Sequence, residues 1–234
     1  MRGQSHVLGV AILLGVSVVA MGSLTAIIGA VVEENAGHAD ATRVADSLDG
    51  AIDPVATTGT RRGQVSFTEG RLHTVERELR VLRDGRVVET LDANALVFAS
   101  GRDRAAFAAG AVIRGGPGRA DLHTPPPVTV GPETLIVGAP VINGTASVSG
   151  TGGVTVHLTT TVTHERRDLG NGTYAVAIET TTPRPWNETF HAKGATLSTR
   201  DFDGDGVDSV VATFDGERRA YLVVHDLALE VRHA

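Results

Sequence analysis

Residues 7–32 read VLGVAILLGVSVVAMGSLTAIIGAVV, and this stretch decides how the whole chain is organised. No Asp, Glu, Lys or Arg occurs between Arg2 and Glu33. As a helix, the stretch is roughly 39 Å long, enough to cross a hydrocarbon core of about 30 Å. A cleaved secretory signal, the alternative, has an apolar region of only about 7–15 residues. The stretch therefore predicts a transmembrane helix.

The charges on either side of this helix predict its orientation. Arg2 and the free amine stand before it, while Glu33 and Glu34 follow it, which favours an N-terminus inside the cell and a C-terminal part outside. Beyond it, Val44, Leu48 and Ile52 recur every four residues, as on one face of a helix. We therefore expect one transmembrane and outward-extended helix over residues 4–53, ended by Pro54.

Small residues recur along the apolar helix. Gly15, Gly22 and Gly29 are seven residues apart and so fall on one stripe of the helix. A stripe of glycine lets a second helix come close, which is the usual basis of helix association in lipid. Glycine is also simply common in membrane helices. We favour a packing stripe.

The extreme N-terminus carries a resemblance to a known group of proteins. Arg2-Gly3-Gln4-Ser5-His6 runs directly into the apolar helix. This arrangement resembles the class III signal of archaeal type IV pilins and archaellins, and the whole chain is similar to pilin-like envelope proteins of halophilic archaea. The resemblance implies that a prepilin peptidase cuts between Gly3 and Gln4, leaving residues 1–3 as the leader peptide. It also implies that the retained helix packs against those of other pilin-like subunits.

Composition sets further bounds on the function. Hydrophobic residues make up 41% of the chain but aromatic residues only 4%, so Val, Ala, Leu and Ile must form the core. The net charge of −6 argues against nucleic-acid binding. Lys193 is the only lysine, a bias that favours a halophilic, high-GC source, since arginine is less strongly hydrated than lysine. There is no cysteine, which excludes disulfides and thiolate metal sites.

After a linker expected at residues 54–63, short runs of β-forming residues alternate with turns. Many short strands separated by Gly, Pro and Asn predict a mainly β fold, with an antiparallel β-sandwich-like extracellular domain over residues 64–234. Turns are expected at Asp84-Gly85 and Asn171-Gly172. The expected strands are Gln64–Thr68, Glu76–Arg83, Arg86–Leu91, Leu96–Phe98, Ala105–Ile113, Leu135–Val137, Thr155–Thr163, Thr173–Thr182, Ser209–Phe214, Tyr221–Val224 and Leu227–Val231. One short helix is expected at Trp186–Lys193, and Pro125–Pro127 should cross stiffly between the two halves of the sandwich.

Three asparagines stand in N-glycosylation sequons: Asn143, Asn171 and Asn187 are each followed two positions later by Thr. Asn-Gly-Thr is also ordinary turn chemistry. Because the domain is expected outside the cell, we favour a glycoprotein modified on at least one of the three.

The densest group of acidic residues is Asp201-Phe-Asp203-Gly-Asp205-Gly-Val-Asp208. Carboxylates at alternate positions, with glycine permitting a tight turn, can converge on a hard cation such as Ca²⁺. The segment resembles a single FG-GAP-type loop, which implies a bound calcium ion. The alternative is a solvated acidic hairpin with no metal. Asp201, Asp203, Asp205 and Asp208 are the expected ligands.

No catalytic apparatus is legible in the sequence. G-x-S-x-G, H-E-x-x-H and Walker A sequences are all missing, and the histidines have no metal-ligand spacing. We therefore expect a non-enzymatic, single-pass cell-surface protein. The favoured function is a pilin-like structural subunit of a surface filament or envelope complex. The alternative is a monomeric membrane-anchored binding module, adhesin-like, that takes a cation or a glycan.

Overall fold

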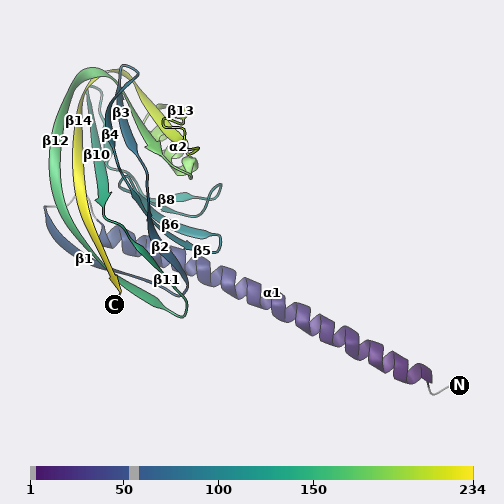
Figure 1. Ribbon diagram of the computed structural model, residues 1–234. Coiled ribbons are helices and arrows are strands. Elements are labelled where there is room, and N and C mark those ends of the chain that lie inside the picture. The colour runs from purple at the N-terminus through teal and green to yellow at the C-terminus, as the bar shows by residue number, and fades with distance from the viewer. Residues whose placement is uncertain (1–3, 53–57, 234) are drawn as a thin grey trace.

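The computed structural model describes residues 4–52 and 58–233, except for the side chains of residues 4–13 and 25–35. A long helix, α1 (Gln4–Ala51), leads into a body of two β-sheets, so the chain is mainly β, as predicted (Figure 1). The remaining elements are β1 (Gly59–Phe67), β2 (Gly70–Val75), β3 (Leu79–Arg83), β4 (Arg86–Leu91), β5 (Ala95–Ser100), β6 (Asp103–Ala108), β7 (Ala111–Arg114), β8 (Asp121–Thr124), β9 (Val128–Val130), β10 (Thr134–Asn143), β11 (Ser147–Gly150), β12 (Val154–Glu179), α2 (Pro183–Ala192), β13 (Thr196–Arg200) and β14 (Ser209–His233).

The two sheets differ in size and pairing. The larger has eight strands in the order β4-β3-β12-β14-β10-β9, with β1 also paired to β12 and β13 to β14. The smaller has six, in the order β11-β2-β5-β6-β7-β8. All pairs are antiparallel except β10 with β14, which is parallel, so the expectation of a purely antiparallel sandwich was wrong at that pair. Both sheets contribute to both large apolar clusters of the core.

The two longest strands correct the sequence prediction. Asn171-Gly172 is not a turn: the expected strands 155–163 and 173–182 fall largely within one strand, β12, of 26 residues. Both halves of β12 pair with β14 instead of with each other, and the register shifts on either side of Gly172 absorb the glycines as an irregularity. Likewise, the three strands expected over residues 209–231 are the single strand β14.

The positions of some turns were predicted correctly. Asp84 and Gly85 have φ of 52° and 75°, as a type I′ turn requires, and they join β3 to β4 as predicted. The strand expected over residues 105–113 is instead the hairpin β6–β7, because Ala109 and Gly110 also take positive φ. Pro125–Pro127 does pass from one sheet to the other, between β8 and β9.

The C-terminal part of α1 is built into the body. Val44 and Leu48 are fully buried and Ile52 is 3% exposed, so the predicted apolar stripe packs into one of the two large clusters. β1 begins at Gly59 and pairs with β12 from there, so the second half of the expected linker 54–63 is a strand. Residues 53–57 of that linker lie outside the described residues.

The second helix packs elsewhere. α2 lies close to the helix expected at residues 186–193, and its Trp186 and Phe190 are buried in the other large cluster. Along β14, residues 220, 222 and 224 belong to that cluster, whereas residues 227 and 229 belong to the cluster that holds α1. Because side chains alternate along a strand, the two clusters meet β14 on opposite faces at these positions.

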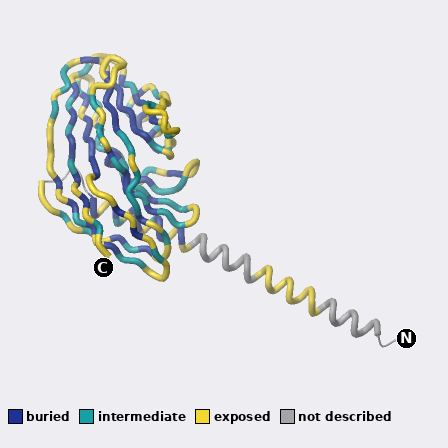
Figure 2. Tube along the Cα trace, in the orientation of Figure 1, coloured by how far each residue is buried: buried dark blue, intermediate teal, exposed yellow. Residues whose placement is uncertain are grey.

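The N-terminal part of α1 extends away from the body, and its side chains from 14 to 24 are exposed (Figure 2). Within the described part of the chain, no helix has both the length and the apolar character needed to cross a bilayer. The expected transmembrane stretch 7–32 includes the side chains of 7–13 and 25–32, which lie outside the described residues, as do the leader residues 1–3.

Candidate functional site

The acidic segment forms the loop between β13 and β14. Positive φ at Gly204 and Gly206 lets the chain turn twice within this loop. Asp201, Asp203 and Asp205 each place a carboxylate oxygen within 4.8 Å of the others. Asp208 does not belong to this group, and its carbonyl oxygen instead accepts a hydrogen bond from the Thr180 N–H at 3.0 Å.

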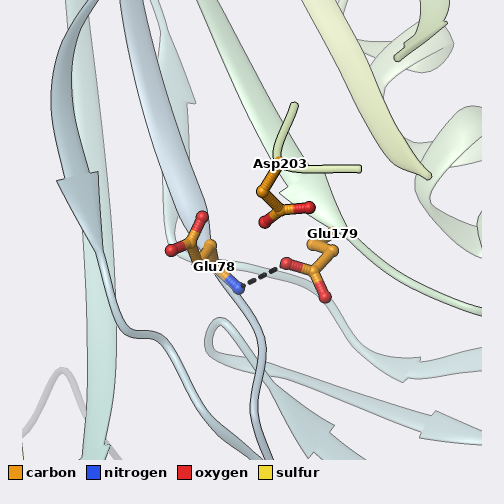
Figure 3. Close-up of side chains that lie close together, drawn as sticks. All are labelled: Glu78, Glu179 and Asp203. Atoms are coloured by element: carbon orange, nitrogen blue, oxygen red, sulfur yellow. Dashed lines mark hydrogen bonds between the residues drawn. The ribbon is translucent and has the colours of Figure 1, made fainter. Parts of the chain in front are cut away.

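The fold adds two carboxylates that the sequence did not single out. Glu78, just before β3, and Glu179, at the end of β12, come together with Asp203, again within 4.8 Å (Figure 3). The Glu78 N–H donates to Glu179 Oε2 at 3.2 Å. Glu179 is only 5% exposed, whereas Asp203 is exposed. Asp203 therefore belongs to two acidic groups, one exposed on the loop and one partly buried beneath it.

The surroundings shift the protonation of two of these carboxyls in opposite directions. Burial raises the pKa of Glu179, against the effect of the nearby Arg77 guanidinium. The Asp205 N–H, which donates to Asp203 at 3.3 Å, lowers the pKa of Asp203, and Arg80 lowers it further. The exposed carboxylate thus stays charged most readily, while the buried one is the most easily protonated.

Arg80 already neutralises part of this charge. Its side chain is buried and forms ion pairs with Glu78 and, at 2.9 Å, with Asp203. The guanidinium groups of Arg80 and Arg200 both contact the Phe202 ring, with their central carbons 4.8 Å and 4.5 Å from its centroid. A divalent ion at Asp203 would compete with Arg80, so the exposed side of the loop, towards Asp201 and Asp205, is the more accessible place for one.

Ser209 is one more oxygen beside the buried carboxylate. It is 1% exposed, and its Oγ has no hydrogen-bond partner among the described residues. Ser209 stands directly opposite Glu179 in the β12–β14 ladder, so both side chains lie on one face of the sheet. The arrangement offers carboxylate and hydroxyl oxygens, the ligands that hard cations prefer.

The other expected sites are spread over the molecule. Asn143, at the end of β10, is exposed and donates to Asp226 Oδ1 at 2.8 Å. Asn171 is exposed on β12, and Asn187 is half-buried on α2. All three sequons therefore reach the surface, and the two Asn-Gly pairs, at Asn143 and Asn171, do not form the two-residue turn that this dipeptide suggests.

The residues expected to pack or process the helix are described only in part. A Cβ added to Gly15 or Gly22 would meet nothing within 4 Å, so this side of the helix is open. Gly3 lies outside the described residues, and so do the side chain of Gln4 and the surroundings of Gly29. Any helix packed on this stripe would have to come from another molecule.

The chain belongs to a family of unknown function, DUF7289, whose sequence pattern matches residues 2–230. No curated protein matches the chain. No solved structure matches it either. The family match covers both the long helix and the β body, so the two parts occur together as the characteristic unit of this family.

Proposed function

We propose that this protein is a membrane-anchored, pilin-like, non-enzymatic structural subunit of a surface filament or envelope complex, with its β body outside the cell. One observation carries the proposal: α1 is a single helix whose C-terminal part is built into the body, while the apolar side chains described in its N-terminal part, from Leu14 to Leu24, are exposed. The halophilic archaeal origin and the N-glycosylation of the sequons expected from sequence belong to the same proposal.

The bare part of the helix argues for a nonaqueous environment. Between Leu14 and Leu24, six large apolar side chains are 59–72% exposed, and no charged residue lies among them. Soluble monomers rarely expose continuous apolar patches of this kind, because water around apolar surface is unfavourable. Lipid, or the helices of other subunits within lipid, would cover them.

A membrane-partition experiment tests the anchor. Val18→Arg combined with Val19→Arg places two charges near the centre of the apolar stretch, each unfavourable there by about 2.5–3.5 kcal/mol. We expect this variant to leave the membrane fraction. Val87→Arg with Val88→Arg, at side chains 44% and 38% exposed on β4, is the matched control and should stay with membranes. Equal membrane partition of both variants would contradict the anchor.

Assembly through the glycine stripe can be tested with single cysteines, because the chain has no native one. Gly22→Cys lies on the stripe, whereas Leu24→Cys lies about 200° around the helix from it. In membranes, oxidation should link the first variant into dimers and leave the second monomeric. If neither variant forms a disulfide dimer while both remain membrane-bound, the helix does not pack through this stripe.

Processing offers an independent test of the pilin-like assignment. A prepilin peptidase cut between Gly3 and Gln4 would leave a mature chain that begins at Gln4 and keeps its helix. Mass spectrometry of the membrane-extracted protein should find that N-terminus, and Gly3→Val should block the cut. A mature protein that starts near Ala30 would instead make the apolar stretch a signal peptide.

A monomeric anchored binding module is the second candidate, favoured by one feature of the body. A cavity of about 210 Å³ lies between the strands β2, β5 and β6 and the segment Thr180–Thr182. Small side chains such as Ala95, Val97 and Ala106 form its apolar floor, and Arg77 and Arg104 supply positive charge. Apolar cavities with a few polar groups are typical ligand sites. The cysteine experiment separates the candidates, since a monomer forms no stripe-specific dimer.

A further inference from the structure

Four arginine side chains lie near the place where α1 enters the body. A hollow of about 400 Å³ opens there, between the β5–β6 turn, the β7–β8 loop and the start of α2. One wall is α1 itself: Arg114 donates to Thr42 Oγ1 at 3.3 Å, and His38 lies 3.6 Å from Asp103. The charged residues that line the hollow are Arg102, Arg114, Arg119, Arg184, Asp103, Asp121 and His38.

The hollow carries an excess of positive charge on a chain whose net charge is −6. Arg184 lies 3.8 Å from Asp121 and pairs with Glu188 at 2.9 Å. Arg102, Arg114 and Arg119 form no ion pair with any described residue. Arg102 and Arg119 are also exposed, so two guanidinium groups are available to an external anion.

The position of the hollow along α1 sets what it can reach. Thr42 and His38 lie ten and six residues beyond Val32, where the apolar stretch ends, or about 15 Å and 9 Å along a helix. The headgroup layer of one leaflet is about 5–8 Å deep. The β5, β6 and β8 ends of the small sheet face the side of the body from which α1 emerges (Figure 1). Extended arginine side chains at this height would meet the headgroups of a bilayer around residues 7–32.

We propose that this arginine hollow binds the phosphate of anionic lipid headgroups in the leaflet facing the body. The inference rests on the proposed membrane anchor. The guanidinium group is planar and donates two parallel hydrogen bonds to phosphate oxygens. In phosphatidylcholine the positive ammonium group of the choline offsets the phosphate charge and repels arginine, whereas a headgroup such as glycerol leaves the phosphate with a net negative charge. The bound lipid holds the base of the body against the membrane.

The full chain, reconstituted into vesicles, tests this directly. Backbone hydrogen exchange over residues 115–120 is measured in phosphatidylcholine vesicles and in vesicles that also contain phosphatidylglycerol, at one ionic strength. We expect exchange to be several-fold slower with phosphatidylglycerol. Arg102→Gln combined with Arg119→Gln should remove the difference. Arg62→Gln with Arg86→Gln, two exposed arginines on β1 and β4, changes the net charge equally and should keep it.

Three other outcomes would overturn the inference. Equal exchange in the two vesicles, or a difference that survives in the Arg102/Arg119 variant, would mean that the hollow does not bind the lipid. Slower exchange on adding inorganic phosphate to phosphatidylcholine vesicles, with no effect of phosphatidylglycerol, would make it a site for a free anion. Flotation of the vesicles distinguishes failure of the lipid site from failure of the membrane anchor. Protein that floats with both kinds of vesicle but shows no exchange difference refutes only the lipid site. Protein that floats with neither kind refutes the anchor as well.

Discussion

Leu48 is one of the fully buried side chains that pack α1 into the body. It is fully buried among residues of α1, β1 and the small sheet, including Phe67 and Phe98. Leu48→Ala removes this contact and leaves a cavity, which lowers the free energy of unfolding by about 2–5 kcal/mol. With a urea dependence of about 2 kcal/mol per molar, the unfolding midpoint should fall by about 1–2.5 M.

Fluorescence of the only tryptophan can report unfolding at a distance from Leu48. Trp186 is fully buried in the other large cluster, which does not include Leu48. A urea titration of the full chain in detergent micelles, followed by Trp186 fluorescence, therefore reports whether damage at the helix is felt across the whole body. Val87→Ala, at a side chain 44% exposed, is the control and should change the free energy of unfolding by less than about 0.5 kcal/mol. An unchanged Trp186 midpoint in Leu48→Ala would refute the reasoning that α1 and both clusters form one cooperative unit.

Three further outcomes are expected. Ca²⁺ at fixed ionic strength should raise the unfolding midpoint, and Asp203→Asn with Asp205→Asn should abolish the shift while Asp215→Asn keeps it; equal midpoints with Ca²⁺ and chelator would leave an acidic loop without a metal. The intact mass of protein extracted from native membranes should exceed the sequence mass by a glycan, and an unmodified mass would leave the sequon asparagines as unmodified surface residues. Burial lowers the pKa of His225 from 6.5 to about 4, so on acidification the unfolded chain takes up a proton at this residue before the folded chain does. The free energy of unfolding should therefore fall as the pH drops from about 6.5 to about 4. His225→Gln should flatten this dependence, which urea unfolding followed by circular dichroism at several pH values would check.

Features that depend on neighbouring residues were predictable from the sequence. The stripe of Val44, Leu48 and Ile52 is a helical repeat, and the same spacing that predicts it places all three side chains in the core. Asp84-Gly85 adopts the positive φ angles that its residue types favour, so the turn between β3 and β4 could be placed to the residue, although β3 begins at Leu79 and not at Glu76 as expected. In both cases the information and the structure lie within a few residues of each other.

Features that depend on distant partners were not predictable in this way. Asn171-Gly172 has the composition of a turn, but each half of β12 pairs with β14, and ladder pairing on both sides keeps the strand extended. Glu78 and Glu179 are 101 residues apart, and the β3–β12 pairing brings them together. The β12–β14 pairing then brings Asp203, on the loop before β14, next to both. The alternating aspartates indicated only the part of this acidic cluster that lies on the β13–β14 loop. Nothing in the sequence pointed to Arg80, whose guanidinium already neutralises part of the cluster.

The way α1 is attached constrains how the body can be presented at a membrane. We expected one helix over residues 4–53 and a linker over residues 54–63. The helix does continue without a break from the exposed stretch ending at Leu24 to the buried Val44, about 30 Å further along its axis. Because Val44 and Leu48 are already buried in the body, the segment after Ala51 connects two parts of the body. If residues 7–32 span a bilayer, the height and facing of the body follow from the helix alone. The arginine hollow would then lie against the headgroups. Copies packed through the glycine stripe would present their bodies in one repeated orientation. A structural subunit requires such a fixed orientation, whereas a flexibly tethered receptor does not.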